Sequence, residues 1–352
     1  MNQITVTIAI PVFNGEKYLK EAIDSVLAQS RQPDEILVVN NNSSDNTLKI
    51  CQYYEPRIIV VSHPETLSMA DNWTSCFQEA KSEFVMICHA DDELFPKAVE
   101  ETYKIISQYP EVDHIFGQTW LYNGERSFPN ASEKFGLLTS EEYFLRSCRS
   151  YYHYNSGTTT RKNLVLSIEG YKNEFKHITD VDFFIRVGLK ARSVYAIDKP
   201  LGTYRIHQSN LHKTLNQESI ADYEYIKLFE KIAQEYDIQE SLKSQALKNL
   251  FPVLTQSITK NLRNNKLAQG SDLFNTIDQS INRSIDQHKD YLISGLTGQG
   301  KIIYGLSNGG NFGISLAWLI VKAWETINSL KSSPSENKQY NLSELTKLSS
   351  IN

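Results

Sequence analysis

Three acids follow closely on an apolar run in residues 84–96, FVMICHADDELFP. The first five residues have the composition of a strand buried on both faces, and Asp91, Asp92 and Glu93 come just after it. Adjacent carboxylates repel each other, so the arrangement costs energy unless a cation or solvating water relieves it. Because hard divalent cations prefer oxygen ligands, the acids predict a Mg²⁺ or Mn²⁺ site, with an acidic surface turn as the alternative.

The elements that would position these acids alternate between strand and helix. Apolar, β-branched runs predict strands at residues 4–14, 35–39, 57–63 and 84–88, and helical spacing predicts helices at 15–30, 69–80 and 96–109. This alternation predicts an α/β fold with a mostly parallel sheet flanked by helices. Ligands bind outside the carboxyl ends of such strands. Polar residues at three of these ends, 11–14, 40–45 and 89–93, therefore predict one shared site.

The pattern of elements changes in the second third of the chain. Thr139 and Glu142 have the spacing of a capping box at the start of a short helix, and TDVDFFIRVGLKA (179–191) predicts another helix. Residues 193–207 predict a strand, a turn and a second strand. We therefore predict three regions, which are an α/β domain at 1–215, a mainly helical region at 216–331 and a disordered tail at 332–352.

Composition limits the classes of function. The net charge of −5 argues against a nucleic-acid partner. Four cysteines without CxxC spacing predict reduced core thiols in a cytoplasmic protein. No apolar run reaches the roughly 18 residues that a membrane span needs. The strongest run, ISLAWLIV at 314–321, has two interpretations: a helix in the core or in a homodimer interface, and a helix lying peripherally on the cytoplasmic membrane face.

Five motifs resemble, in order and spacing, those of family 2 glycosyltransferases. They are IPVFNGEKYLKEAIDSVLAQ, VVNNNSSDNT, ADDELFP, TDVDFFIRV and YRIH. The resemblance covers residues 4 to about 212 and leaves out the C-terminal third. It implies a GT-A-like fold, which is a nucleotide-binding α/β domain with a metal-binding DXD-type motif, and a nucleotide-sugar donor.

The resemblance also implies roles at the donor diphosphate. Asp92 would be a direct ligand of Mg²⁺ or Mn²⁺, and Asp91 would face the ribose or the sugar. Arg205 and His207 alternate on one strand, where Arg205 would hold phosphate and His207 would complete the metal shell; an exposed strand edge is the alternative. His89 departs from the family, which usually has an acid at this position, and we interpret it as a bystander or a hydrogen-bond donor.

The nucleotide base would lie across the ends of the first two strands. Phe13 falls where the family places an aromatic residue that stacks on the base, and Pro11 and Asn14 would shape the same loop. Asn40 falls where an Asp commonly binds the uracil N–H, and the Asn carbonyl can accept the same hydrogen bond. The alternatives are a core aromatic for Phe13 and a plain turn residue for Asn40.

Asp180 is the candidate catalytic base. It matches the acid of the family's Glu-Asp pair, which is Thr179-Asp180 here. A carboxylate in this position would take the proton from the acceptor hydroxyl during an inverting transfer. The alternative is structural: Thr179 as a helix N-cap with Asp182 three residues on. Asp182 and Arg186 have the spacing of an ion pair on one helix face.

These observations predict a metal-dependent, inverting glycosyltransferase. Its donor would be a nucleotide-diphosphate sugar, with UDP favoured and dTDP or GDP as alternatives, and its acceptor a hydroxyl group of a glycan or lipid-linked molecule. The rival interpretation is a catalytically silent nucleotide-sugar- or glycan-binding scaffold of polysaccharide assembly, because Asn40, His89 and Thr179 replace family acids.

Overall fold

The computed structural model describes residues 4–122, 126–127, 135–149, 154–208, 210 and, with gaps at 226, 229–230, 233 and 248, residues 224–250. The described residues belong to one compact unit, Met1–His288. The helix predicted at 314–321 and the tail predicted at 332–352 lie outside the described residues. The domain boundary near residue 215 stays a prediction.

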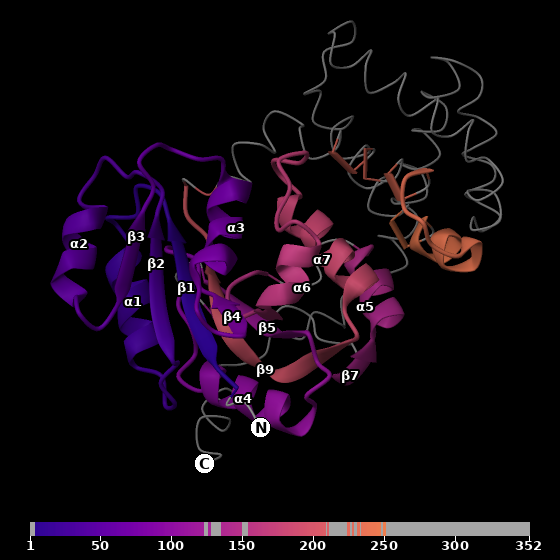
Figure 1. The fold of residues 1–352 in the computed structure, drawn as a ribbon, viewed down its shortest axis with the longest axis horizontal. Helices are drawn as coiled ribbons and strands as arrows, with labels where there is room; N and C mark the ends of the chain where they lie inside the picture. Colours follow the sequence, from indigo (N-terminus) through magenta and orange to yellow (C-terminus); the bar gives the residue numbers. More distant parts are fainter. Residues whose placement is uncertain are drawn as a thin grey trace, which may run out of the picture. The chain divides into compact units, whose positions relative to one another are not determined.

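One mixed sheet organises the molecule (Figure 1). Its strands are β1 (Val6–Val12), β2 (Glu35–Asn40), β3 (Ile59–Ser62), β4 (Phe84–Ile87), β5 (His114–Tyr122), β6 (Arg126–Ser127), β7 (Gly136–Thr139), β8 (Thr159–Arg161) and β9 (Ser193–Arg205). The order is β3-β2-β1-β4-β8-β5-β9-β7, with β6 paired to β5. The first four strands are parallel, whereas β8 is antiparallel to both of its neighbours. The parallel half confirms the predicted α/β arrangement.

Helices cover both faces of the sheet (Figure 1). They are α1 (Leu19–Leu27), α2 (Thr47–Tyr54), α3 (Met69–Glu79), α4 (Ala98–Gln108), α5 (Ser140–Ser147), α6 (Lys162–Ser167) and α7 (Thr179–Lys190). One core joins α1, α2 and α4 to the sheet, and a second core joins α3, α5, α6 and α7 to its other face. Strand β1 shows the alternation that makes this possible, because Ile8 and Ile10 enter the first core and Ala9 enters the second.

The segment at 193–207 corrects one expectation. The predicted strand, turn and strand form a single strand, β9, which runs parallel to β5. The pairing passes from Gly117 with Ile197 to Gln118 with Pro200, so the turn-like residues 198–199 are taken up by a register shift. Because β5 continues to offer pairing partners beyond the shift, the chain bulges and keeps its direction instead of turning back.

Two smaller expectations are confirmed. Thr139 is the N-cap of α5 and forms the reciprocal capping box with Glu142. All four cysteines are free and buried, and burial raises the pKa of the Cys51 thiol to about 11. Among the described residues, no helix is long and apolar enough to cross a membrane.

Candidate active site

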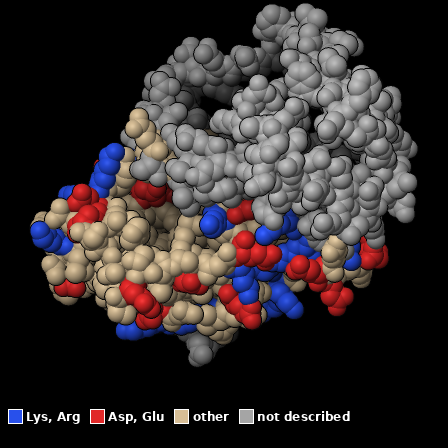
Figure 2. Space-filling model, turned by 90° about the horizontal axis from the view of Figure 1, so that it is seen from above, with Lys and Arg blue, Asp and Glu red and all other residues tan. Residues whose placement is uncertain are grey.

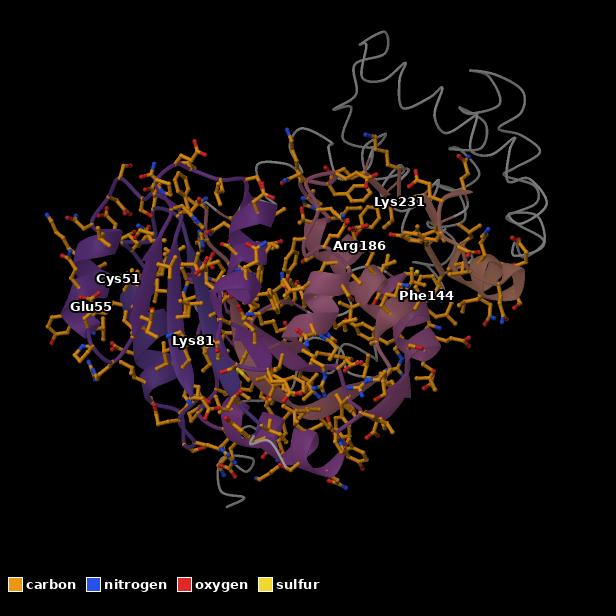
Figure 3. All side chains as sticks on the ribbon, viewed as in Figure 1. Cys51, Glu55, Lys81, Phe144, Arg186 and Lys231 are labelled. Atoms are coloured by element: carbon orange, nitrogen blue, oxygen red, sulfur yellow. The ribbon has the colours of Figure 1, made fainter. Side chains whose placement is uncertain are left out.

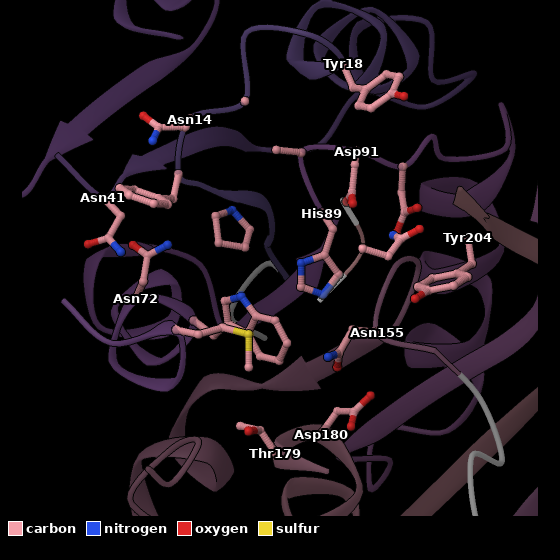
Figure 4. A pocket seen from close by; sticks show the side chains of 18 of the residues that line it. Asn14, Tyr18, Asn41, Asn72, His89, Asp91, Asn155, Thr179, Asp180 and Tyr204 are labelled. Carbon is pink, nitrogen blue, oxygen red and sulfur yellow. The ribbon is translucent and has the colours of Figure 1, made fainter. Parts of the chain in front are cut away.

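A cavity of about 920 Å³ lies where the ends of several elements meet. Its walls come from the β1 and β4 ends, the start of α3, the start of α7 and the end of β9. This placement at the carboxyl ends of β1 and β4 matches the site predicted from the three polar strand ends. Figure 4 shows Asp91 and Asp180 on opposite sides of the cavity, with His89 between them.

The β1 end forms a pre-shaped loop at the cavity. Asn14 has a positive φ of 49°, and its side-chain carbonyl accepts a 2.9 Å hydrogen bond from the Ser44 N–H. Its own N–H donates to the Ser43 hydroxyl at 2.9 Å, so the β1 and β2 loops hold each other. Phe13 lines the cavity and is 54% exposed, which rules out the alternative of a core aromatic. Pro11 lines the same wall.

Three neighbouring amides behave differently. Asn40 is buried outside the lining, where its side chain donates to the Ser62 hydroxyl and accepts from the Ser43 N–H, both at 3.2 Å. Asn41 does line the cavity. Its side-chain carbonyl accepts a hydrogen bond from the Leu67 N–H at 2.8 Å, and its side-chain amide donates to the Leu67 carbonyl at 3.0 Å. Asn72 also lines it, and its buried side-chain carbonyl has no hydrogen-bond partner among the described residues. Such an orphan acceptor is the kind of group that a ligand donor satisfies.

The two aspartates differ in exposure. Asp92 is only 2% exposed and accepts hydrogen bonds from the Ser156 hydroxyl at 2.5 Å and the Arg205 N–H at 2.8 Å. Burial, followed by the charge of Asp91, raises the pKa of Asp92 well above its ordinary value. Asp91 is more accessible, and its carboxylate lies 3.1 Å from the His207 Nε2. Both side chains line the cavity wall.

Arg205 supports this acidic tip from outside the lining. Its guanidinium donates to Glu21 at 2.5 Å, to Glu93 at 2.9 Å and to the Asp91 carbonyl at 2.8 Å. The predicted phosphate contact would require the guanidinium to leave these partners. His207 does line the cavity, with its ring 5.1 Å from that of Tyr18.

The donor set fits a hard divalent cation only in part. Asp91, Asp92 and His207 all line the cavity and offer oxygen and imidazole ligands. Within the described residues, however, no group of three or more His, Cys, Asp or Glu side chains is already arranged to hold a metal ion. Mg²⁺-type sites commonly use one or two carboxylates and take their remaining ligands from water and substrate phosphates. The residues present are compatible with that kind of site.

His89, the departure from the family's acid, faces an aromatic wall. Its ring lies 4.7 Å from that of Trp73, and both residues line the cavity. Burial lowers the pKa of the His89 ring, although the nearby Asp91 opposes the change. A neutral imidazole in this position adds no charge to the acidic tip.

Asp180 occupies the first turn of α7 and lines the opposite wall. Burial raises its pKa from 3.8 to about 6, while a 2.9 Å hydrogen bond from the Val181 N–H opposes the change. The alternative reading of Thr179 as the N-cap is wrong, since Ile178 holds that position and the Thr179 hydroxyl donates to the Phe175 carbonyl at 2.5 Å. The expected ion pair of Asp182 and Arg186 is confirmed at 2.7 Å.

An aromatic pair completes the wall near the candidate base. The rings of Tyr154 and Tyr204 stack at 4.3 Å with an interplanar angle of 19°, and both residues line the cavity. The charge of Asp180 contributes to raising the pKa of both phenols, after the larger effect of burial. Flat apolar rings beside polar groups are suited to packing against a sugar ring.

The structure therefore brings most of the predicted site residues to one cavity. The predicted residues in its lining are Pro11, Phe13, Asn14, Asp91, Asp92, Asp180 and His207. Asn40 and Arg205 are not in it. Sequence reasoning missed Asn41, Trp73 and Tyr204, although Asn41 and Tyr204 adjoin residues that it singled out. Trp73 lies within the helix predicted at 69–80, and only tertiary contacts reveal that its ring also reaches the cavity.

Comparisons with known proteins identify the family and the fold. The model of the family described as Glycosyl transferase family 2 matches residues 7–179. The chain is 24% identical over 237 residues to an uncharacterized glycosyltransferase, MJ1057, of Methanocaldococcus jannaschii, a match that covers 64% of this chain and 80% of that protein. It is also 24% identical over 225 residues to the minor teichoic acid biosynthesis protein GgaA of Bacillus subtilis, covering 61% of this chain and 49% of GgaA.

A solved structure has the same fold. The crystal structure of S. aureus TarS 1–349 in complex with UDP-GlcNAc matches with a TM-score of 0.72 and 16% sequence identity, covering 92% of each chain. The GT-A-like fold expected from the sequence motifs is thereby confirmed.

Proposed function

Because the chain belongs to glycosyltransferase family 2 and is a glycosyltransferase, we propose that it transfers a sugar from a nucleotide-diphosphate donor by an inverting single displacement, with Asp180 as base. The observation that carries the proposal is the placement of Asp91 and Asp180 on opposite sides of one cavity, together with the burial that raises the pKa of Asp180 to about 6. The cavity that both aspartates line has a volume of about 920 Å³, which is large enough for a nucleotide-sugar ligand.

The nucleotide end of the donor would occupy the β1 side. Phe13 offers an exposed ring for stacking, and Asn72 offers a buried acceptor without a partner among the described residues. An acceptor of this kind suits the N–H of a pyrimidine such as uracil. We therefore favour a UDP-sugar, in keeping with the ligand of the TarS structure, and dTDP- and GDP-sugars are the alternatives.

The diphosphate would lie at the acidic tip. Asp91, Asp92 and His207 are the residues that would hold Mg²⁺ or Mn²⁺, and such an ion neutralises negative charge on a leaving diphosphate. Arg205 keeps this tip in place through the Asp91 carbonyl and the Asp92 carboxylate. Its role in the proposal is support rather than direct contact with phosphate.

The acceptor would approach from the α7 side. Its hydroxyl oxygen forms the new bond to the sugar C1 as the bond from C1 to the diphosphate oxygen breaks, and the hydroxyl proton passes to the Asp180 carboxylate. A base whose pKa is about 6 is ionised at neutral pH and still basic enough to accept that proton. The stacked Tyr154 and Tyr204 would pack against the acceptor or transferred sugar, and we propose a glycan or lipid-linked acceptor of a cell-envelope polysaccharide pathway, as the similarity to GgaA suggests.

Replacing Asp180 tests the base. We expect Asp180→Asn to lower kcat by about 10²–10⁴-fold, because the amide cannot accept the proton, with the donor KM changed little. Turnover is measured as nucleotide diphosphate released in the presence of acceptor. Asp198→Asn is the matched control, since Asp198 is exposed on β9 and its carboxylate accepts a 2.8 Å hydrogen bond from the Gln118 side chain. Wild-type turnover in Asp180→Asn would remove Asp180 from this role.

A further inference from the structure

A buried carboxylate from the C-terminal side of the chain holds the turn that precedes the candidate base. Glu224 is 5% exposed, and its two oxygens accept hydrogen bonds from three successive backbone N–H groups. The donors are Lys176 at 2.6 Å, His177 at 2.7 Å and Ile178 at 3.1 Å. Charge-assisted hydrogen bonds of this kind are stronger than neutral ones. Three of them fix the backbone of residues 176–178 relative to the Glu224 carboxylate.

The start of α7 lacks a cap of its own. Ile178 occupies the N-cap position, and its side chain cannot accept a hydrogen bond. Glu224 therefore supplies, from 46 residues along the chain, the negative charge that favours a helix N-terminus. Asp180 lies two positions after Ile178, so the turn fixed by Glu224 leads directly into the candidate base.

Lys231 and Tyr236, which follow Glu224 in the chain, also contact residues next to this turn. The Lys231 ammonium pairs with Glu174, lies 5.4 Å from the centre of the Phe175 ring and 3.7 Å from the Asp182 carboxylate. The Tyr236 hydroxyl donates to that carboxylate at 3.2 Å. Lys231 and Arg186, the ion-pair partner of Asp182, are labelled in Figure 3, which shows both in the part of the molecule that contains α7.

We propose that Glu224 is a positioning residue for the transfer reaction, which sets the orientation of Asp180 in the cavity through the turn 176–178. This inference rests on the proposed role of Asp180 as base. Lys176, His177 and Thr179 line the cavity together with Asp180, so movement of the turn would displace this wall. The donor wall at Phe13 and Asp91 follows β1 and β4 in the chain, whereas the described hydrogen bonds of the Glu224 carboxylate go to residues 176–178.

Kinetics and a double-mutant cycle test the proposal. We expect Glu224→Ala to lower kcat at least tenfold while the donor KM stays within about twofold, and Glu224→Gln to lie between Glu224→Ala and wild type because it keeps one carbonyl oxygen. In an Asp180→Asn background, Glu224→Ala should cause almost no further loss, since the group it positions is gone. Glu240→Gln is the matched control, because Glu240 is exposed on the same segment and pairs with Lys243.

Amide hydrogen exchange provides a readout that does not depend on catalysis. The N–H groups of residues 176–178 should exchange at least tenfold faster in Glu224→Ala and in Glu224→Gln than in wild type, while those of α3 are unchanged. Unchanged exchange at 176–178 would overturn the proposal, as would an equal loss of kcat from Glu224→Ala with and without Asp180. If Asp180→Asn alone retained wild-type turnover, the proposed base would be wrong, and the exchange result would still decide whether Glu224 holds the turn.

Discussion

At the scale of single residues, burial decides the chemistry of Asp180. Its pKa rises to about 6 because the surrounding protein solvates the carboxylate less well than water does. The acid thus combines two properties, since it is charged at neutral pH and is a stronger base than an exposed aspartate. The same displacement of the pKa leads to two measurable consequences.

The first consequence concerns the pH dependence of turnover. Asp180 accepts a proton only in its ionised form, so kcat should fall about tenfold for each pH unit below about 6 and level off above it. The measurement is kcat at saturating donor and acceptor between pH 5 and pH 8. A profile without this acidic limb would contradict the assigned pKa or the assigned base.

The second consequence concerns stability. The folded protein keeps a proton on Asp180 up to about pH 6, whereas the unfolded chain releases it near the ordinary value of 3.8. Stability from this group is therefore lost as the pH rises from 3.8 to about 6, and Asp180→Asn should stabilise the protein on the order of 2 kcal/mol above pH 6. Denaturant unfolding at pH 7.5 and pH 4 measures the difference, which should shrink at the lower pH. A less stable variant at pH 7.5 would contradict this account.

Phe13 provides a residue-scale test of the donor side. Loss of a stacked ring costs about 1–3 kcal/mol per base, so Phe13→Ala should weaken nucleotide binding about tenfold or more. Stability should change little, because the ring is 54% exposed. Tyr53→Ala is the control, since Tyr53 is 77% exposed on α2 and does not line the cavity. Equal nucleotide affinity in both variants, measured by calorimetry with UDP, would remove Phe13 from the site.

At the scale of elements, α7 is held against α5 by close backbone approach. A Cβ added at Gly188 of α7 would lie 2.7 Å from the Cα of Phe144 and 2.8 Å from its backbone nitrogen. Phe144, labelled in Figure 3, belongs to α5. Glycine is therefore required here by packing, although it lies in the middle of a helix where it is unfavourable by about 1 kcal/mol relative to alanine.

Gly188→Ala measures this contact. The gain in helix propensity of about 1 kcal/mol should be outweighed by overpacking against a backbone that cannot move locally, for a net loss of about 1–2 kcal/mol. Because α7 carries Asp180, kcat should fall as well. Lys190→Ala, at an exposed position of the same helix, should stay within about 0.5 kcal/mol of wild type. A Gly188→Ala protein more stable than wild type would show that α5 and α7 can shift apart enough to accept the added methyl group.

At the scale of the whole molecule, positively and negatively charged side chains are intermixed on the described surface. Figure 2 shows Lys and Arg interspersed with Asp and Glu over the described part of this face. The net charge of the chain is −5. Such a surface does not favour polyanions in general.

Binding of the donor nucleotide should stabilise the whole molecule. A ligand present at 100 times its Kd adds about 2.7 kcal/mol, so UDP with Mn²⁺ should raise the Tm by about 5 °C. UDP with EDTA should give a smaller rise, because the diphosphate then loses the ion that the acidic tip would share with it. An equal shift with and without EDTA would argue against the metal site. A larger shift with GDP or dTDP than with UDP would mean that the donor carries that nucleotide instead of UDP.

The sequence by itself determined the features that depend on local periodicity and short-range chemistry. The alternation of strands and helices, the capping box at Thr139 and the polar strand ends could all be read without a structure. Local rules were less reliable where a distant partner competes. The turn-like residues 198–199 remain within β9 because β5 pairs on both sides of them.

Only the tertiary structure decided which of the candidate residues share the cavity. Asn40 ends β2 and Asn41 directly follows it, yet only Asn41 lines the cavity, whereas the Asn40 side chain bonds to Ser62 and Ser43. Likewise, nothing near Asp180 in the sequence indicates that Glu224 secures its turn. Contacts between residues that are far apart in the chain depend on how the elements pack, and single-sequence patterns carry no record of that packing.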